Sequence, residues 1–217
     1  MQSKPKIWRI DPENVSTEAI SEAVSILERG GLVIYPTETF YALGAVATIA
    51  GAVEKVFAAK KRNVGMALPV ICSDKKAVLA CTGRWPKEAE ILAGAFWPGP
   101  LTLLLPASPL LPPVLHTGTG KVAVRISPHP AASLLARLSG GTLVSTSANL
   151  SGDPAPAGPR EISEAIINGV DGFIDAGDLP GGLPSTIVDV TLTPPRLVRS
   201  GALPWEAISR ALSDQNS

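Results

Sequence analysis

The sequence predicts one α/β domain that contains a mixed, mostly parallel β-sheet with helices on its faces. Short apolar runs of strand length alternate along the chain with segments whose apolar residues recur at helical spacing. Two strand-like runs follow each other near the end of the chain, so the sheet is expected to be mixed. No internal repeat or domain boundary interrupts this order in the 217 residues. We therefore expect a lead-in over residues 1–15 and one domain over residues 16–217.

The expected helices are bounded by capping residues and by helix breakers. Ser16 or Thr17 caps the first helix, which ends near Arg29 because two glycines, Gly30 and Gly31, follow it. On the same grounds, further helices are expected from Thr48 to Arg62, from Asp74, at 86–95, at 129–138, at 160–168 and from Pro204 to about Leu212.

The expected strands are aliphatic runs bounded by turn residues. They lie at residues 7–10, 32–35, 67–72, 101–105, 121–126, 142–145, 172–175, 185–191 and 195–199. Two segments rich in Pro, Gly and small polar residues, 106–120 and 153–159, are expected to be surface loops.

The stretch YPTETFYALG, residues 35–44, follows the buried strand at 32–35 directly. Proline cannot donate to a strand ladder, so we expect the strand to leave the sheet at Pro36. The hydroxyl groups of Thr37 and Thr39 then lie at the carboxyl end of a strand, where open α/β sheets hold their ligands. This stretch is the first candidate for a binding site.

Charge and composition exclude several classes of protein. Lys and Arg total 19, as do Asp and Glu, so the net charge is zero, which argues against a strongly basic nucleic-acid binder but leaves room for a local basic cleft. Cys72 and Cys81 are nine residues apart, and with His116 and His129 they form no zinc motif. We see no signal peptide and no apolar run of about 18 residues, so we expect a soluble, cytoplasmic protein without a membrane partner.

Two further motifs are rejected. Residues 118–123 match a dinucleotide fingerprint as a string of letters, but they precede a predicted strand instead of following one. A Ser/His/Asp triad would need His116 or His129, which both lie beside turn residues.

Basic and hydroxyl side chains gather just after predicted strands or helices. They are Thr37, Thr39, Lys60, Arg62, Arg125, Ser145, Ser147, Asn149, Ser185, Thr186 and Arg199. Arginine makes bidentate contacts with phosphate or carboxylate, and lysine supplies a point charge. Residues 147–149 can offer hydroxyl, amide and backbone N–H donors to a nucleotide. Taken singly, each arginine can be a structural ion-pair partner, and residues 147–149 can form a capping turn. Together, these side chains predict an anion site.

Five segments in one order resemble the YrdC/TsaC family, the threonylcarbamoyl-AMP synthases. They are Tyr35–Thr39 with Leu43-Gly44, Lys60–Arg62, Phe96–Thr102, Ser145–Gly152, and Ser185–Asp189 followed by Arg199–Gly201. Val122–Arg125 also fits the pattern. The resemblance covers the chain from about residue 20 to residue 203, and its specificity lies in the order of the whole set.

The resemblance implies a twisted mixed α/β sheet with a concave basic face. It also implies condensation of L-threonine, bicarbonate and ATP to threonylcarbamoyl-AMP and pyrophosphate, for the t6A37 modification of tRNA. Downstream, a threonylcarbamoyl transferase machinery would pass the group on, and tRNA or double-stranded RNA is a further partner to test. Mg²⁺ is expected to bind mainly through the phosphates of ATP. Longer family members carry an extra C-terminal domain, which we expect to be absent here.

The resemblance also assigns roles to individual residues. Positions matching those that hold L-threonine are Thr39, Arg125, Ser145 and Ser185, with Thr37 as a neighbouring candidate. Positions matching those around ATP are Lys60, Arg62, Ser147, Asn149 and Arg199. Lys60 and Arg62 are expected to be catalytic, because they can stabilise the charge of the triphosphate and the leaving pyrophosphate.

Some positions depart from the family pattern, and two other functions stay open. Asn63 stands where Pro is usual, and Met66 stands where a polar residue is usual, although a thioether cannot replace a charged or amide donor. One alternative is a YciO-like paralogue that keeps the fold without this activity. The other is an RNA-binding module, against which the zero net charge and the few aromatic residues argue.

Overall fold

The computed structural model describes residues 4–12, 14–62 and 67–214. Its strands are β1 (Lys6–Arg9), β2 (Val33–Pro36), β3 (Tyr41–Gly44), β4 (Val70–Cys72), β5 (Leu101–Pro106), β6 (Lys121–Arg125), β7 (Thr142–Val144), β8 (Thr146–Ser147), β9 (Gly172–Asp175), β10 (Thr186–Asp189) and β11 (Arg196–Arg199). Its α-helices are α1 (Thr17–Glu28), α2 (Ala50–Ala59), α3 (Lys75–Cys81), α4 (Lys87–Phe96), α5 (Pro113–His116), α6 (Pro130–Leu138), α7 (Glu164–Ile167) and α8 (Trp205–Asp214). Within these ranges, no helix is long and apolar enough to cross a membrane.

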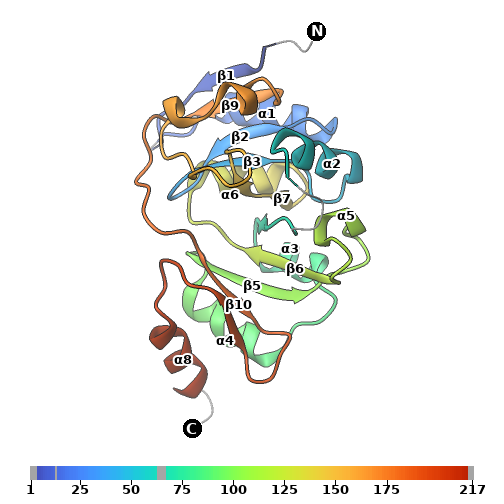
Figure 1. Cartoon of the computed structure of the whole chain (residues 1–217), viewed down its shortest axis with the longest axis vertical. Coiled ribbons are helices and arrows are strands. Elements are labelled where there is room, and N and C mark those ends of the chain that lie inside the picture. Colours follow the sequence, from blue (N-terminus) through green and yellow to red (C-terminus); the bar gives the residue numbers. More distant parts are fainter. Residues whose placement is uncertain (1–3, 13, 63–66, 215–217) are drawn as a thin grey trace.

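The strands form two mixed sheets, which lie one above the other along the long axis in Figure 1. One sheet has the strand order β1-β9-β2-β3-β8, and the other has the order β11-β10-β5-β6-β4-β7. The predicted mixed α/β class is confirmed, but the prediction of one sheet is wrong. The reason lies between β3 and β7, where a single bridge from Val46 to Leu143 replaces a continuous ladder.

The chain changes sheets at Ser145. β7 belongs to the six-stranded sheet and β8, which begins one residue after Ser145, belongs to the five-stranded sheet. The backbone N–H of Ser145 donates to the carbonyl oxygen of Pro69 (2.8 Å), next to β4. A residue at this junction faces groups from both sheets.

The strand β2 ends at Pro36, as predicted, but the chain then returns to the same sheet, which the sequence did not indicate. The chain turns over residues 37–40 and returns as β3, with Pro36 opposite Tyr41. The Oγ1 of Thr37 closes this turn by donating to the carbonyl oxygen of Phe40 (2.6 Å). Gly44 is required opposite β2, because a Cβ there would lie 2.6 Å from a ring carbon of Tyr35.

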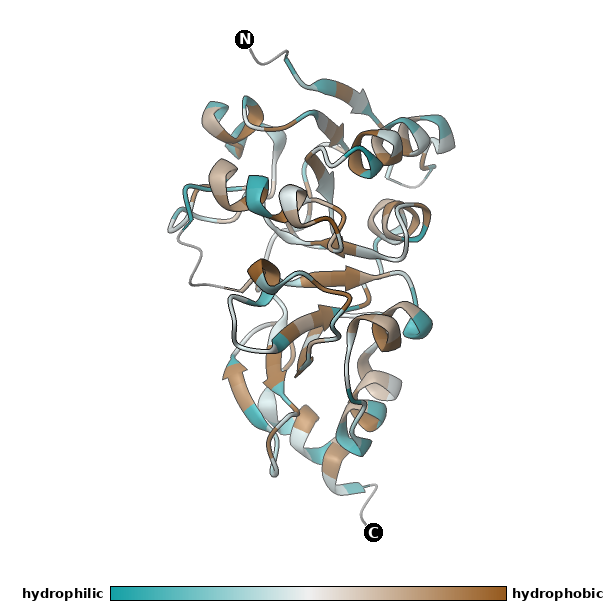
Figure 2. Ribbon diagram, turned by 90° about the vertical axis from the view of Figure 1, so that its right-hand side faces the viewer, coloured by the Kyte–Doolittle hydropathy of each residue, from teal (hydrophilic) through white to brown (hydrophobic). Residues whose placement is uncertain are grey.

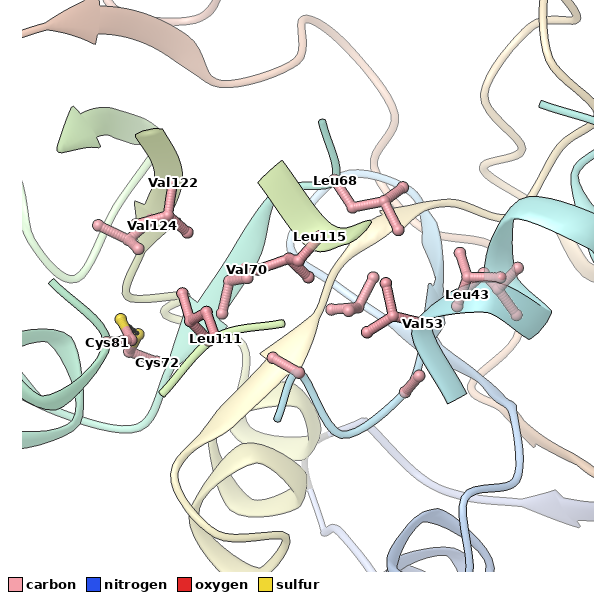
Figure 3. Close-up of a cluster of buried hydrophobic side chains, with 14 of the residues drawn as sticks. Leu43, Val53, Leu68, Val70, Cys72, Cys81, Leu111, Leu115, Val122 and Val124 are labelled. Atoms are coloured by element: carbon pink, nitrogen blue, oxygen red, sulfur yellow. Dashed lines mark hydrogen bonds between the residues drawn. The ribbon is translucent and has the colours of Figure 1, made fainter. Parts of the chain in front are cut away.

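Two apolar clusters hold the sheets and helices together. In one, α1 and α6 cover the five-stranded sheet, with Ile20, Leu135 and Ile174 fully buried. The other extends from Leu43 and β4 to α5, as Figure 3 shows. In Figure 2 the strands carry much of the most hydrophobic colour, which agrees with sheets buried between helices and loops.

Three predicted elements need correction. Ile49 is the N-cap of α2 and offers no side-chain hydrogen bond, so Thr48 does not cap this helix. The segment 106–120 contains the short helix α5, whose Leu115 is buried in the core. The helix expected at 160–168 is a 3-10 turn followed by α7, because the chain is extended at Ile162.

Candidate active site

A cavity of about 590 Å³ lies where the two sheets meet. The turn at residues 37–40 and β8 border it from the five-stranded sheet, and Thr102, Arg125 and Arg199 border it from the six-stranded sheet. Eight of the ten predicted site residues line it: Thr37, Thr39, Arg62, Arg125, Ser145, Ser147, Ser185 and Arg199. The other two, Lys60 and Asn149, are not among its lining residues and bond to each other, and Asn149 lines a second cavity of about 330 Å³ that shares Ala155 with the first. Sequence positions up to 162 residues apart therefore meet at one site.

The two threonines of the turn have different hydrogen bonds. Besides donating to Phe40, the Oγ1 of Thr37 accepts from the backbone N–H groups of Thr39 (3.4 Å) and Phe40 (3.3 Å). Thr37 is 4 % exposed, so its hydroxyl is committed to the turn, whereas Thr39 is half-buried beside the cavity. Thr39 is therefore the better placed of the two to contact a ligand.

Arg125, at the end of β6, is paired with Glu38 at the tip of the turn. Nη1 of Arg125 donates to Oε1 of Glu38, and Oγ of Ser127 donates to Oε2 of the same carboxylate (2.8 Å). The side chains of Arg125 and Glu38 are 11 % and 22 % exposed. The pair links the two sheets across the cavity and leaves both charges partly accessible from it.

Arg199, at the end of β11, holds the residues that precede β10. Its Nη2 donates to the carbonyl oxygen (2.7 Å) and to Oγ (3.1 Å) of Ser185. A second hydroxyl, Oγ1 of the buried Thr102, lies 2.8 Å from Ser185 Oγ. Gly201 allows β11 to come this close, because a Cβ there would lie 2.2 Å from the carbonyl oxygen of Pro184. Arg199, assigned to ATP by resemblance, thus contacts a residue assigned to threonine.

Lys60 is 2 % exposed and lies under the turn at residues 147–149. Its Nζ donates to the carbonyl oxygens of Ser147 and Asn149, the latter at 2.7 Å, and to Oδ1 of Asn149 (3.2 Å). Burial and the nearby charge of Arg62 lower the pKa of Lys60 to about 8. In this arrangement Lys60 orients the turn and contributes charge from behind it.

Arg62 reaches the cavity with part of its hydrogen-bonding capacity unused. Nη2 donates to the carbonyl oxygen of Ala67 (3.2 Å), whereas the buried Nε has no hydrogen-bond partner among residues 4–12, 14–62 and 67–214. Burial lowers the pKa of this guanidinium. A buried N–H without an acceptor is unfavourable, so an anion arriving here would gain a donor that is already desolvated. Asn63 and Met66, which depart from the family pattern, lie outside the described residues.

The cavity is suited to anions and zwitterions. Its charged lining residues are three arginines, Arg62, Arg125 and Arg199, and one glutamate, Glu38, so positive charge predominates. In the part of the chain that the structure describes, no three His, Cys, Asp or Glu side chains gather as a metal site. Guanidinium and hydroxyl groups recognise phosphate and carboxylate by hydrogen bonds.

Three contributors to the site, Glu38, Thr102 and Ser127, are absent from the predicted set. Glu38 stands between the two predicted threonines, and Thr102 ends the segment Phe96–Thr102 quoted for the resemblance, so both carried a signal. The sequence carried no such signal for Ser127, because a lone serine before a proline is typical of an ordinary turn.

Comparisons with known proteins identify the family of this chain. A family model named Sua5_yciO_yrdC, with the description "Telomere recombination", matches residues 25–201. The chain belongs to this family. Relatives named threonylcarbamoyl-AMP synthase are 38 % identical over 93 % of the chain in Pyrococcus abyssi and 36 % identical over 98 % in Bacillus subtilis. The chain spans 59 % and 65 % of the length of these two relatives. A relative in Mycobacterium tuberculosis, named putative threonylcarbamoyl-AMP synthase, is 36 % identical, and the chain spans 92 % of it.

Solved structures in the family have the same fold. P. abyssi Sua5 complexed with L-threonine superposes with a TM-score of 0.89 at 36 % identity, covering 96 % of this chain and 61 % of Sua5. Escherichia coli YciO superposes with a TM-score of 0.84 at 26 % identity, covering 94 % of this chain and 99 % of YciO. The predicted fold class is thereby confirmed at the level of the family.

Proposed function

We propose that this chain is an L-threonylcarbamoyladenylate synthase. It would condense L-threonine, bicarbonate and ATP to threonylcarbamoyl-AMP and pyrophosphate. The observation that carries the proposal is the meeting of eight predicted site residues in one cavity of a chain that belongs to this family. The synthase names of its relatives and the L-threonine in the P. abyssi Sua5 structure support it.

L-Threonine would occupy the part of the cavity formed by Thr39, Arg125, Ser145 and Ser185. The guanidinium of Arg125 suits the substrate carboxylate, since Arg and carboxylate form charge-assisted hydrogen bonds. Hydroxyl groups at Thr39 and Ser185 can exchange hydrogen bonds with the substrate hydroxyl. Thr37 would act through the shape of the turn, because its own hydroxyl is already bonded to Phe40.

ATP would bind on the side of the cavity where Arg62 and Ser147 lie. The Nε of Arg62, for which no described residue supplies an acceptor, can donate to a phosphate oxygen. Lys60 and Asn149 would act from behind the turn, keeping Ser147 and its backbone N–H oriented toward the nucleotide. Arg199 lines the cavity and holds Ser185, so it can contact either substrate. Burial first, and then the charge of Arg125, lower the pKa of Arg199.

The chemistry needs positions and charges more than a protein nucleophile. The amine of threonine and bicarbonate give a carbamate with loss of water. A carbamate oxygen then attacks the α-phosphorus of ATP, a new P–O bond forms, and the bond to pyrophosphate breaks. Such reactions depend chiefly on alignment and on neutralising the charge that builds up on the phosphates. Lys60, Arg62 and Arg199 supply positive charge within or just behind the cavity.

Mg²⁺ would enter with the nucleotide. Glu38, the carboxylate among the cavity's lining residues, is already engaged by Arg125 and Ser127. The donor set therefore fits a metal ion bound mainly by phosphate oxygens and water, as is usual for Mg²⁺ on nucleotides.

The wider role follows from the product. A cytoplasmic transferase machinery would pass the threonylcarbamoyl group to tRNA for the t6A37 modification, and tRNA or double-stranded RNA would bind the concave, basic face that the resemblance implies. Residues 16–217 would act as one catalytic domain after the lead-in at 1–15.

The proposal is tested by pyrophosphate release in a substrate-omission series. Release should need ATP, L-threonine and bicarbonate together, and it should fall to background when any one is left out. Release that is indifferent to threonine would overturn the proposed function.

A YciO-like paralogue remains the second candidate, because E. coli YciO superposes over nearly its whole length with this chain. This alternative expects ATP to bind without formation of a threonine adduct. Binding of ATP together with no threonine-dependent release would favour it.

A further inference from the structure

Glu38 places a negative charge beside a positive one in the cavity wall. Its carboxylate lies between Arg125 and Ser127, and all the other charged residues that line the cavity are arginines. An anion site alone has no use for this carboxylate, because it cancels part of the field that would attract phosphate. Its presence calls for a ligand that carries a positive group.

The carboxylate has unused hydrogen-bonding capacity toward the cavity. An ionised carboxylate offers about four lone-pair sites, and among the residues that the structure describes there is one contact at Oε1 and one at Oε2. The side chain of Glu38 remains 22 % exposed, and it borders the cavity. A third donor can therefore reach Glu38 without breaking the contact with Arg125.

Besides Arg125 and Tyr35, His129 is a titratable group that interacts with the charge of Glu38. It lies at the start of α6 and is 9 % exposed. Burial lowers the pKa of His129, although Glu38 opposes this effect, so the imidazole is neutral at pH 7. Glu38 thus faces one full positive charge, that of Arg125, with Tyr35 as a further, uncharged neighbour.

We propose that Glu38 and Arg125 together form a receptor for the zwitterion of an α-amino acid. Arg125 receives the α-carboxylate, and Glu38 receives the α-ammonium group. This inference rests on the proposed function and deepens it, because it makes Glu38 the residue that selects an amino acid over a hydroxy acid. The same contact would hold the nitrogen that bicarbonate must reach.

The experiment compares two ligands that differ only in the amino group. L-Threonine and (R)-3-hydroxybutyrate are titrated calorimetrically into the wild-type protein and into Glu38→Gln. The amide introduced by this substitution keeps an acceptor for Arg125 but loses the negative charge. We expect the wild-type preference for threonine to fall by roughly 10- to 100-fold in the variant, the range of a charge-assisted hydrogen bond.

A purely structural role of Glu38 gives a different result. If Glu38 only positions Arg125, the variant weakens both ligands by the same factor and the preference is unchanged, which would overturn the inference. Wild-type protein that does not bind threonine at all would instead contradict the proposed function. Failure of the inference is therefore seen in the titrations of Glu38→Gln, and failure of the proposed function is seen in those of the wild type.

Two further variants complete the test. Glu90→Gln removes a carboxylate that is likewise in an ion pair, with Lys75 (2.6 Å), but does not line the cavity. This variant should leave the preference unchanged. Glu38→Asp keeps the charge but draws it back by one methylene, so it should retain part of the preference. If Glu38→Gln does not fold, the ratio measured with Glu38→Asp decides: a preference equal to that of the wild type would overturn the inference.

Discussion

The ammonium group of Lys60 lies 2.7 Å from the carbonyl oxygen of Asn149 and 3.2 Å from its side-chain oxygen. With its third contact, to the carbonyl oxygen of Ser147, this buried cation fixes the turn that follows the switch between the two sheets. The backbone N–H of Ser151 donates in return to the carbonyl oxygen of Lys60 (3.0 Å). The turn and the end of α2 therefore form one unit beside the cavity.

Replacing Lys60 should loosen this turn. Lys60→Met keeps the length of the side chain but leaves three acceptors without their donor, so we expect a loss of about 1–3 kcal/mol in the free energy of unfolding. ATP affinity should fall as well, because Ser147 is no longer held. Urea denaturation and equilibrium ATP binding measure the two effects. Lys61→Met, at the exposed neighbour, is the control and should change neither.

The lowered pKa of Lys60 predicts a pH dependence of stability with a definite sign. The pKa is about 8 in the folded protein against an ordinary 10.5, so between these values the unfolded chain binds more protons. The free energy of unfolding of the wild type should therefore rise, relative to Lys60→Met, as the pH increases from 8 to about 10.5, and should stay level below pH 8. If the free energies of unfolding of the two proteins changed in parallel between pH 8 and about 10.5, the lowered pKa of Lys60 would be contradicted.

Arg62 is expected to be needed for the reaction but not for folding. Arg62→Ala removes one hydrogen bond, from Nη2 to Ala67, and a buried Nε that has no partner among the described residues, so little stability should be lost. Product formation should drop by at least about 100-fold, because the phosphates lose a charge-assisted contact in the transition state. Initial rates and thermal unfolding separate the two effects. Arg84→Ala, at an exposed arginine that is not among the lining residues, should behave as the wild type.

Thr102 should affect threonine binding through Ser185. Thr102→Val removes the hydroxyl that lies 2.8 Å from Ser185 Oγ, so the latter loses a fixed orientation. We expect the KM for threonine to rise roughly 2- to 10-fold with little change in the KM for ATP. Thr82→Val is a matched control, because the buried Oγ1 of Thr82 has no hydrogen-bond partner in the described part of the chain. Equal effects of both variants would show that Thr102 acts only by packing.

The two cysteines should be unreactive in the folded protein. Their sulfur atoms lie 3.7 Å apart in the core, side by side in Figure 3. The hydrogen bond with Cys81 and burial raise the pKa of Cys72 well above its usual range, so the reactive thiolate is scarce. Iodoacetamide at about pH 7.5 should label neither thiol in the native protein and both in urea, as mass spectrometry would reveal. Rapid labelling of the native protein would contradict this burial.

The fold was largely predictable from periodicity, apart from the hairpin of β2 and β3. Pro36 and the two threonines after it read as an exit from the sheet, since no Asn-Gly or similar dipeptide marks a turn there. A side-chain hydrogen bond, from Thr37 to Phe40, closes the turn instead. The division into two sheets was hidden for a related reason: it depends on long-range pairing at Val46, which local sequence patterns do not report.

For the site, chemistry in the sequence predicted the members but not their geometry. Arg125 and Ser185 were predicted from residue type and order, and both line the cavity. The partners that orient them, Glu38 in the turn between β2 and β3 and Thr102 in β5, become evident only when the chain is folded. The burial of Lys60 was likewise unforeseen, because cations in the last turn of a helix are usually solvated.

The most direct test of the proposed synthase is the fate of labelled bicarbonate. The protein is incubated with ATP, Mg²⁺, L-threonine and ¹³C-bicarbonate. The nucleotides are then separated by chromatography, and their masses are measured by mass spectrometry. We predict a threonylcarbamoyl-AMP that carries one ¹³C atom, is absent without threonine, and is lost in Arg62→Ala but kept in Arg84→Ala. Unlabelled nucleotides alone, from wild-type protein that binds both ATP and threonine, would contradict the proposed function.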